Sequence, residues 1–170
     1  MQNFIIRITQ KNFLLTERAE IGCFILPDTL EDAFAGEFVH KARQNGKLVL
    51  VVGQAALNKY AAWQADGLII DTSKEAAPQK VLKAAKEKAP QALIGAVVRN
   101  RRHEAMLASE AEPDFVIFRV WADGFAATQE LLTWYSELFL IQCAAQIEEP
   151  CAYAALPADF IILDDTQWQK

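Results

Sequence analysis

The sequence has little of what catalytic and metal-binding motifs usually need. It contains three cysteines and two histidines among 170 residues. Cys23, Cys143 and Cys151 are odd in number and lack C-x-x-C spacing, and neither His40 nor His103 is followed by a second ligand three or four residues later. We therefore expect buried thiols and structural histidines, with no metal site and no cofactor.

Long apolar runs and an excess of basic residues are also lacking. No run approaches the roughly 20 residues that a membrane helix needs. The FII run near the N-terminus is too short for the core of a signal peptide and is followed by Arg7. With 22 acidic and 17 basic residues, the net charge is −5, which disfavours nucleic acid or an anionic membrane as the main partner. We expect a cytoplasmic protein.

What the chain does contain is a regular alternation of short apolar runs and segments with helical spacing. Continuous apolarity is typical of strands that are covered on both faces. The runs are Ile21–Leu26, Leu48–Val52, Leu68–Ile70, Leu93–Val98, Phe115–Phe118, Phe139–Cys143 and Phe160–Leu163. Helices are expected over Thr29–Gln44, with Asp28 or Thr29 as its cap, and over Pro78–Lys88, Arg101–Glu112 and Gly124–Glu137. Because the connections are short, we expect a single domain over residues 1–170.

This pattern predicts an α/β fold, a TIM-type (β/α) barrel. A typical closed barrel needs roughly 200 to 250 residues, so this one must be compact or incomplete. Phe4–Ile8 also has strand character, but only about a dozen residues separate it from Ile21, which is short for a crossover helix. Either Lys11–Glu20 forms a short helix and the barrel has eight strands, or the first βα unit is degraded. The second alternative leaves an open edge for a partner subunit to cover.

Several segments carry a resemblance to a known family. LVVGQAALNKYAAWQADGLIIDT has the shape of a strand ending in Asn-Asp, a short helix and Ala-Asp-Gly-Val-His-Leu-Gly-Gln. LIGAVVRN and EPDFVIF are similar to an Ile-Ile-Gly-Val-Ser-Val-His strand and an Ala-Asp-Tyr-Ile strand, and LFLIQCAAQI and PADFIILDD follow with similar spacing. Over about Ile21 to Asp165, the chain resembles the thiamine phosphate synthase and thiazole tautomerase family of barrels.

The resemblance implies a site for pyrophosphate and Mg²⁺, but the positions that would form it carry other residues. In family order they are Ile25, Pro27 and Thr29 for the phosphate clamp, Gly53, Gln54 and the region of Lys74 for the metal ligands, Val97 for a serine, Ala144-Ala145 for a Gly-Gly after the seventh strand, and Asp165 for a serine closing the eighth. Methyl groups crowd an approaching phosphate, and a carboxylate repels it. We therefore expect no synthase activity.

Another polar set follows the strands, where barrels of this class place their sites. Arg99 and Arg119 end neighbouring strands, and side by side they would form a bidentate site for a carboxylate or phosphate. The alternative is a structural ion network in which they pair with Asp71, Asp123 or Asp165. The candidate ligand-binding residues are Arg99, Arg119, Gln54, Trp121 and Asp164, and the candidates for a general acid or base are Asp71 and Asp165.

Two hypotheses about function remain. In the first, the protein is a divergent barrel without synthase activity, a pseudoenzyme that serves as a binding or assembly module and forms a homo-oligomer, such as a dimer, through an open edge or exposed helices. In the second, it is an enzyme of altered chemistry that acts on a small phosphorylated or carboxylated metabolite. The sequence favours the first, because it contains no nucleophile–base pair, metal motif or glycine-rich phosphate loop.

Overall fold

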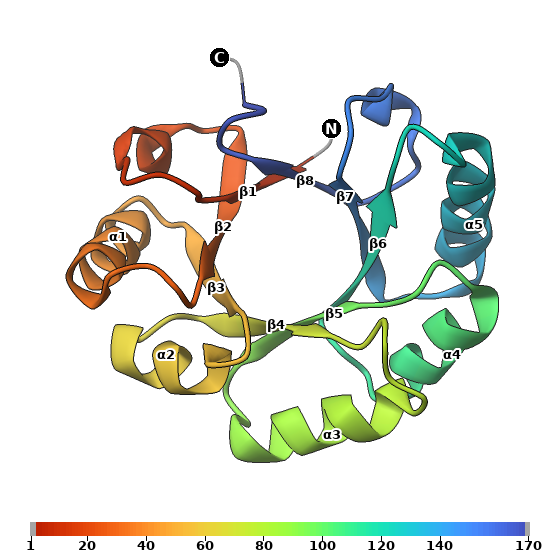
Figure 1. The fold of residues 1–170 in the computed structure, drawn as a ribbon, viewed down its shortest axis with the longest axis horizontal. Helices are drawn as coiled ribbons and strands as arrows, with labels where there is room; N and C mark the ends of the chain where they lie inside the picture. Colours follow the sequence, from red (N-terminus) through yellow and green to blue (C-terminus); the bar gives the residue numbers. More distant parts are fainter. Residues whose placement is uncertain (1–2, 169–170) are drawn as a thin grey trace.

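The computed structural model describes residues 3–168 and shows a closed barrel of eight parallel strands in sequential order (Figure 1). The strands are β1 (Asn3–Arg7), β2 (Ile21–Pro27), β3 (Leu48–Val52), β4 (Gly67–Asp71), β5 (Leu93–Val97), β6 (Phe115–Val120), β7 (Gln142–Ile147) and β8 (Phe160–Asp164). The helices are α1 (Asp32–Gln44), α2 (Ala56–Trp63), α3 (Pro78–Lys88), α4 (Arg102–Glu110) and α5 (Phe125–Leu138), with 3-10 turns η1 (Leu14–Glu17) and η2 (Tyr153–Ala155). The predicted TIM-type barrel is therefore confirmed.

The barrel closes despite the short chain because two of its crossovers contain no α-helix. The β1–β2 and β7–β8 connections carry only η1 and η2. β1 pairs in parallel with both β2 and β8, so the alternative with an open edge was wrong (Figure 1). The eight-strand alternative is the correct one, with a single 3-10 turn inside Lys11–Glu20.

Alternation along the strands creates two separate apolar layers. Strand side chains that face outward pack against the helices, as Phe24 does against Phe38 of α1; both are fully buried. Side chains that face inward form a smaller cluster inside the barrel, which includes Ile5, Ile69 and Ile162. This period of two fixes which residues reach the barrel interior at the end of each strand.

An aspartate before every even-numbered strand from β4 onward ties the N-terminal end of the barrel together. Its carboxylate accepts the N–H of the second residue of the preceding strand, at 2.7 to 2.9 Å, and its own N–H donates to the carbonyl of that same residue. The three pairs are Asp66 with Val49, Asp114 with Ile94 and Asp159 with Cys143. The recurring Asp in ADG, PDF and ADF thus has a structural role, because it satisfies backbone groups at a sheet end.

Three local expectations need correction. The seventh strand is Gln142–Ile147 and not Phe139–Cys143, because Phe139 instead stacks on Tyr135 with ring centroids 4.6 Å apart. Ala144-Ala145 therefore lies within β7 and not after it. The N-cap of α1 is Glu31; the Asp28 carboxylate accepts the Ala55 N–H (2.7 Å) in the loop after β3.

Within residues 3–168, none of the helices has the length and apolar character required to cross a membrane. Cys23 and Cys143 are buried, as expected, while Cys151 is half-buried. His40 and His103 both lie on the surface.

Candidate functional site

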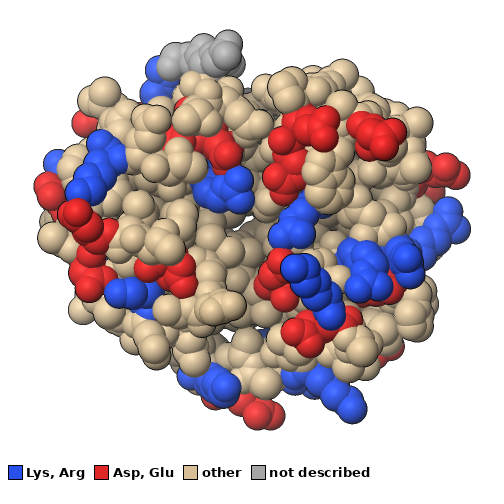
Figure 2. Space-filling view, viewed as in Figure 1, with Lys and Arg blue, Asp and Glu red and all other residues tan. Residues whose placement is uncertain are grey.

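Charged side chains gather at the end of the barrel where the strands terminate. The view down the barrel shows acidic and basic groups interspersed around its central hollow (Figure 2). Alternation from the inward-facing apolar residues aims five polar side chains into this mouth. They are Arg7, Asp71, Arg119, Gln146 and Asp164.

Arg7 and Asp164 join the neighbouring strands β1 and β8 at the rim of the mouth. Arg7 Nε and Nη2 donate to the two carboxylate oxygens of Asp164 at 2.6 and 3.2 Å. The hydrogen bond to Asp164 raises the pKa of the Arg7 guanidinium, which burial alone would lower. Asp164, a predicted ligand-binding residue, thus already has a cationic partner in the structure.

Asp165 holds the loop that follows β1. Its carboxylate accepts the N–H groups of Thr9 (2.8 Å) and Gln10 (3.1 Å) and the hydroxyl of Thr9. The structure therefore gives this predicted acid or base a loop-anchoring position.

Arg119 lies between two carboxylates. Its Nη2 donates to Asp71 at 2.9 Å, and its Nε lies 3.5 Å from Glu148, which in turn accepts from Gln146 at 2.6 Å. Burial tends to raise the pKa of Asp71, but hydrogen bonds from Ser73 and the charge of Arg119 outweigh it and hold the pKa below its usual value. The Arg119–Asp71 pair is one that the ion-network alternative named; the contact with Glu148 is one that it did not.

A pocket of about 260 Å³ lies beside this pair, between the ends of β5 and β6. Arg99, Arg101, Arg119 and Trp121 line it, together with Ser73, Val98 and Asn100. Three arginines thus line a pocket that no acidic residue lines. Trp121 is 41% exposed and forms part of its wall.

The three arginines differ in how far their charges are compensated. Arg99 donates to the Ser73 carbonyl at 3.0 Å and has one long ion pair with Glu104, at 3.8 Å. Arg101, among the described residues, has no ion pair and no side-chain hydrogen bond. The positive charge of the pocket is therefore least compensated along the Arg99–Arg101 segment.

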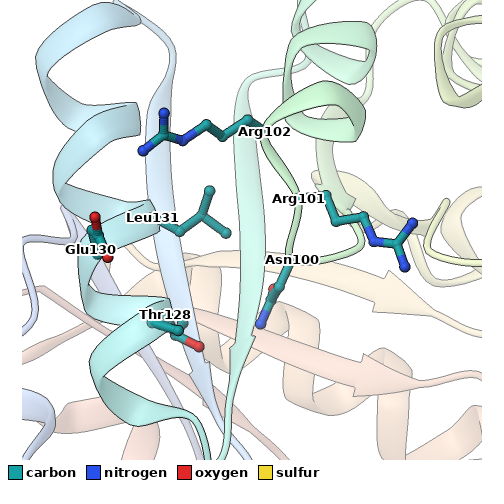
Figure 3. A pocket seen from close by; sticks show the side chains of 7 residues that line it. Asn100, Arg101, Arg102, Thr128, Glu130 and Leu131 are labelled. Carbon is teal, nitrogen blue, oxygen red and sulfur yellow. The ribbon is translucent and has the colours of Figure 1, made fainter.

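Asn100 connects this pocket to a second one, of about 290 Å³, between the same loop and α5. Its Nδ2 donates to the Arg119 carbonyl at 2.8 Å, while its Oδ1 is buried without a hydrogen-bond partner. Arg101 and Arg102 extend to opposite sides of the loop, Arg102 toward α5 (Figure 3). The guanidinium of Arg102 lies 5.1 Å from the ring centre of Trp134.

Gln54 is not part of this cluster. It is exposed in the loop after β3 and lines none of the pockets described for the molecule. The adjacent Gly53 has a φ of +130°, and a Cβ there would collide with the Asp28 carboxylate. This turn therefore requires glycine for a steric reason.

The sequence reasoning missed Arg7, Glu148 and Gln146. Arg7 ends an apolar run, and the alternation that puts Ile5 inside the barrel also puts Arg7 at its mouth. Gln146 and Glu148 were missed because the seventh strand was placed too early. Among residues 3–168, no group of three or more His, Cys, Asp or Glu side chains is arranged to hold a metal ion.

Comparison with known proteins shows similarity at the level of structure. The chain matches no protein-family model and no curated protein sequence. It is similar to the citrate synthase SbnG, with a TM-score of 0.66 and 11% identity over 96% of this chain and 86% of that one. It is also similar to a glycerol uptake operon antiterminator regulatory protein from Listeria monocytogenes str. 4b F2365, with a TM-score of 0.65 and 15% identity over 98% and 95% of the two chains.

A truncated 3-deoxy-D-arabino-heptulosonate 7-phosphate synthase from Thermotoga maritima is a further neighbour. Its TM-score is 0.65 at 14% identity, over 96% of this chain and 74% of that one. The likeness is one of fold alone. These neighbours have different functions and none is a thiamine phosphate synthase, so the activity has to be inferred from this chain's own residues.

Proposed function

We propose that the protein binds a small carboxylated or phosphorylated metabolite at the barrel mouth and has no thiamine phosphate synthase activity. One observation carries this proposal: Arg99, Arg101 and Arg119 line a single pocket that contains no acidic side chain. Its volume of about 260 Å³ equals that of roughly nine water molecules at about 30 Å³ each, which suits a small molecule.

The chemistry of the lining fits such a ligand. Guanidinium groups bind carboxylate and phosphate oxygens through paired N–H donors, and Trp121 offers an apolar wall for the rest of the molecule. The buried Oδ1 of Asn100 can accept a hydrogen bond from a hydroxyl or amino group of the ligand. A metabolite that combines an acidic group with a nearby hydrogen-bond donor would pair with the arginines and with the Asn100 oxygen.

The local backbone supports an anion as well. Arg101 is the N-cap of α4, and Arg102 begins its first turn, where the helix dipole disfavours cations. A bound anion would offset this repulsion, and Glu104 is the acidic residue that now does so in the first turn. Arg99 forms a long ion pair with Glu104, at 3.8 Å, so a bound anion and Glu104 would both contact the charge of Arg99.

The proposal keeps the divergent-barrel hypothesis and applies to the chain as a single domain. Resemblance to the thiamine phosphate synthase group rests on strand character and spacing, and much of that spacing is explained by the aspartates that precede the even strands. An oligomer through exposed helices remains part of the proposal, but edge-to-edge pairing does not, because the barrel is closed. Light scattering on the purified protein would measure the oligomeric state.

Catalysis by the same pocket is the second candidate, and Asp71 is the observation that bears on it. Asp71 contacts Arg119, which lines the pocket, but its lowered pKa makes it a weak base. Binding without turnover is therefore the better-supported function. Product analysis of each ligand after incubation with the protein separates the two candidates.

The test is a calorimetric and thermal-shift screen with phosphate, sulfate, short dicarboxylates and aromatic carboxylates. We expect at least one anion to bind, with affinity that falls as ionic strength rises. Arg101→Ala is expected to weaken binding by roughly fivefold, the effect of about 1 kcal/mol at an exposed site.

Arg102→Ala is the matched control, because it removes the same charge from the next residue but on the other side of the loop (Figure 3). Equal losses in Arg101→Ala and Arg102→Ala would contradict a pocket-specific site. Turnover of a pyrimidine pyrophosphate together with thiazole phosphate would contradict the stated absence of synthase activity.

A further inference from the structure

A second cavity opens at the other end of the barrel. It has a volume of about 520 Å³ and is lined by the first residues of seven strands or their neighbours, including Gly22, Leu48, Leu93 and Phe160. Inward it reaches Ile5, Cys23 and Leu50. This size lies within the range of small-molecule sites, which is about 300 to 1,000 Å³.

The sequence leaves this space unfilled for a local reason. The β1–β2 register shifts between Phe4 and Ile5, so Gly22 is an extra residue on β2, opposite no partner. A Cβ built on Gly22 would meet no atom within 4 Å. At Gly95, in contrast, the ring of Phe115 already occupies the place of a side chain. The bulge at Gly22 thus keeps the base of the barrel open.

The lining is apolar in depth and polar at the rim. Leu50 and Phe115 are buried, while Leu48 is 44% exposed at the entrance. The polar groups are the exposed amides of Asn3 and Gln142 and the carboxylate of Asp114. Because Asp114 accepts the Ile94 N–H, its negative charge is fixed beside the opening.

We propose that this basal cavity binds an uncharged aromatic molecule, with its ring among the apolar side chains and a hydroxyl or amino group at the amide-lined rim. Burial of an apolar ring provides the affinity, and the rim groups orient it. An anionic molecule of the same shape is disfavoured, because its charge would lie near Asp114. The site is independent of the arginine pocket, which lies at the opposite end of the strands.

The test uses N-phenyl-1-naphthylamine, an uncharged dye that fluoresces in apolar surroundings, with displacement by indole and benzyl alcohol. Gly22→Leu puts an isobutyl group where the structure has open space, and it is expected to weaken dye binding by roughly tenfold or more, since two groups cannot share that space. Gly36→Leu is the matched control, because a Cβ on Gly36 in α1 also meets nothing within 4 Å. Both variants should unfold near the temperature of the native protein.

A second variant keeps the proposal testable if Gly22→Leu does not fold. Asp114→Asn retains an acceptor for Ile94 and removes the charge, so benzoate should displace the dye several-fold better than it does from the native protein, with benzyl alcohol unchanged. Arg101→Ala should leave dye binding unchanged. Absence of saturable binding up to about 100 µM dye, or equal affinity in Gly22→Leu and Gly36→Leu, would overturn the proposal.

Discussion

Replacement of Asp71 by Asn should strengthen anion binding at the mouth while it weakens the fold. Asp71 now neutralises Arg119 through a contact of 2.9 Å, and it also accepts from Ser73; Arg119 and Ser73 both line the arginine pocket. Asparagine keeps an oxygen for the N–H and hydroxyl of Ser73, which donate to Asp71 at 2.9 and 2.6 Å. The substitution therefore removes a charge and preserves the local turn.

The expected gain in affinity follows from Coulomb's law. A bound anion about 6 Å from Asp71, at an effective dielectric constant of about 40, is repelled by about 1.4 kcal/mol. Screening by salt reduces this to about 1 kcal/mol, or roughly a fivefold lower Kd. Arg119 stays oriented in the variant, because Glu148 lies 3.5 Å from its Nε.

The expected loss of stability is small. The side chains of Arg119 and Asp71 are 31% and 43% exposed, and ion pairs of that kind contribute about 0.2 to 1 kcal/mol. The folded-state pKa of Asp71 is lowered, so its contribution is present above the pKa of the unfolded chain, near 3.9, and is lost as the pH falls below that value. The stability difference between native protein and variant should therefore vanish in acid.

The assay is calorimetric titration with sulfate, whose charge does not change over the working pH range, together with urea denaturation from neutral pH down to acid. Asp114→Asn is the control, because it removes one negative charge at the opposite end of the barrel. Sulfate that binds Asp71→Asn no more tightly than the native protein would refute the view that Asp71 competes with a ligand for Arg119. A gain of equal size in the control would mean that net charge alone is responsible.

Two further predictions concern the fold. Asp66→Ala leaves the backbone N–H of Val49 without its acceptor and should lower the unfolding free energy, measured in urea, by about 1 to 2 kcal/mol. Asp66→Asn keeps an acceptor and should lower it by less than half as much. Equal losses in the two variants would contradict the hydrogen-bond explanation. Burial raises the pKa of the Cys23 thiol to about 12 and that of Cys143 to about 11, so a thiol reagent at pH 8 should label the half-buried Cys151 first and the other two much more slowly.

The fold could be predicted because its signals are local. Apolar runs such as Leu48–Val52 and first-turn prolines such as Pro78 report directly on a strand or a helix, and both elements have the predicted bounds. The seventh strand failed the same test, since QCAAQI is less apolar than the FLI that precedes it, and only tertiary stacking of Phe139 on Tyr135 decides between them. Whether the first βα unit closes the barrel was likewise undecided, because it depends on pairing between β1 and β8 at the two ends of the chain.

The candidate site was harder to predict because ion pairing depends on distance in space. The strand order placed Arg99, Arg119 and Trp121 at the same end of the barrel, and they do line one pocket. The charges of the two arginines are compensated by Asp71 at the end of β4, Glu148 after β7 and Glu104 in the first turn of α4, and no spacing in the sequence encodes this combination. Arg101 differs from Arg99 and Arg119 because, among the described residues, it has neither an ion pair nor a side-chain hydrogen bond.

The two ends of the barrel explain why the chain can resemble the thiamine phosphate synthase family and yet lack the residues of that family's phosphate and metal site. The Asp of each Ala-Asp or Pro-Asp step is needed by any barrel that must satisfy strand N–H groups at its base, so Asp66, Asp114 and Asp159 would be retained whatever the protein binds. Residues at the mouth are not constrained in this way, and there a steric requirement such as that of Gly53 can replace a ligand without loss of the fold. Motifs at the base of such a barrel therefore indicate how it is built, and its function has to be inferred from the arginines at the mouth.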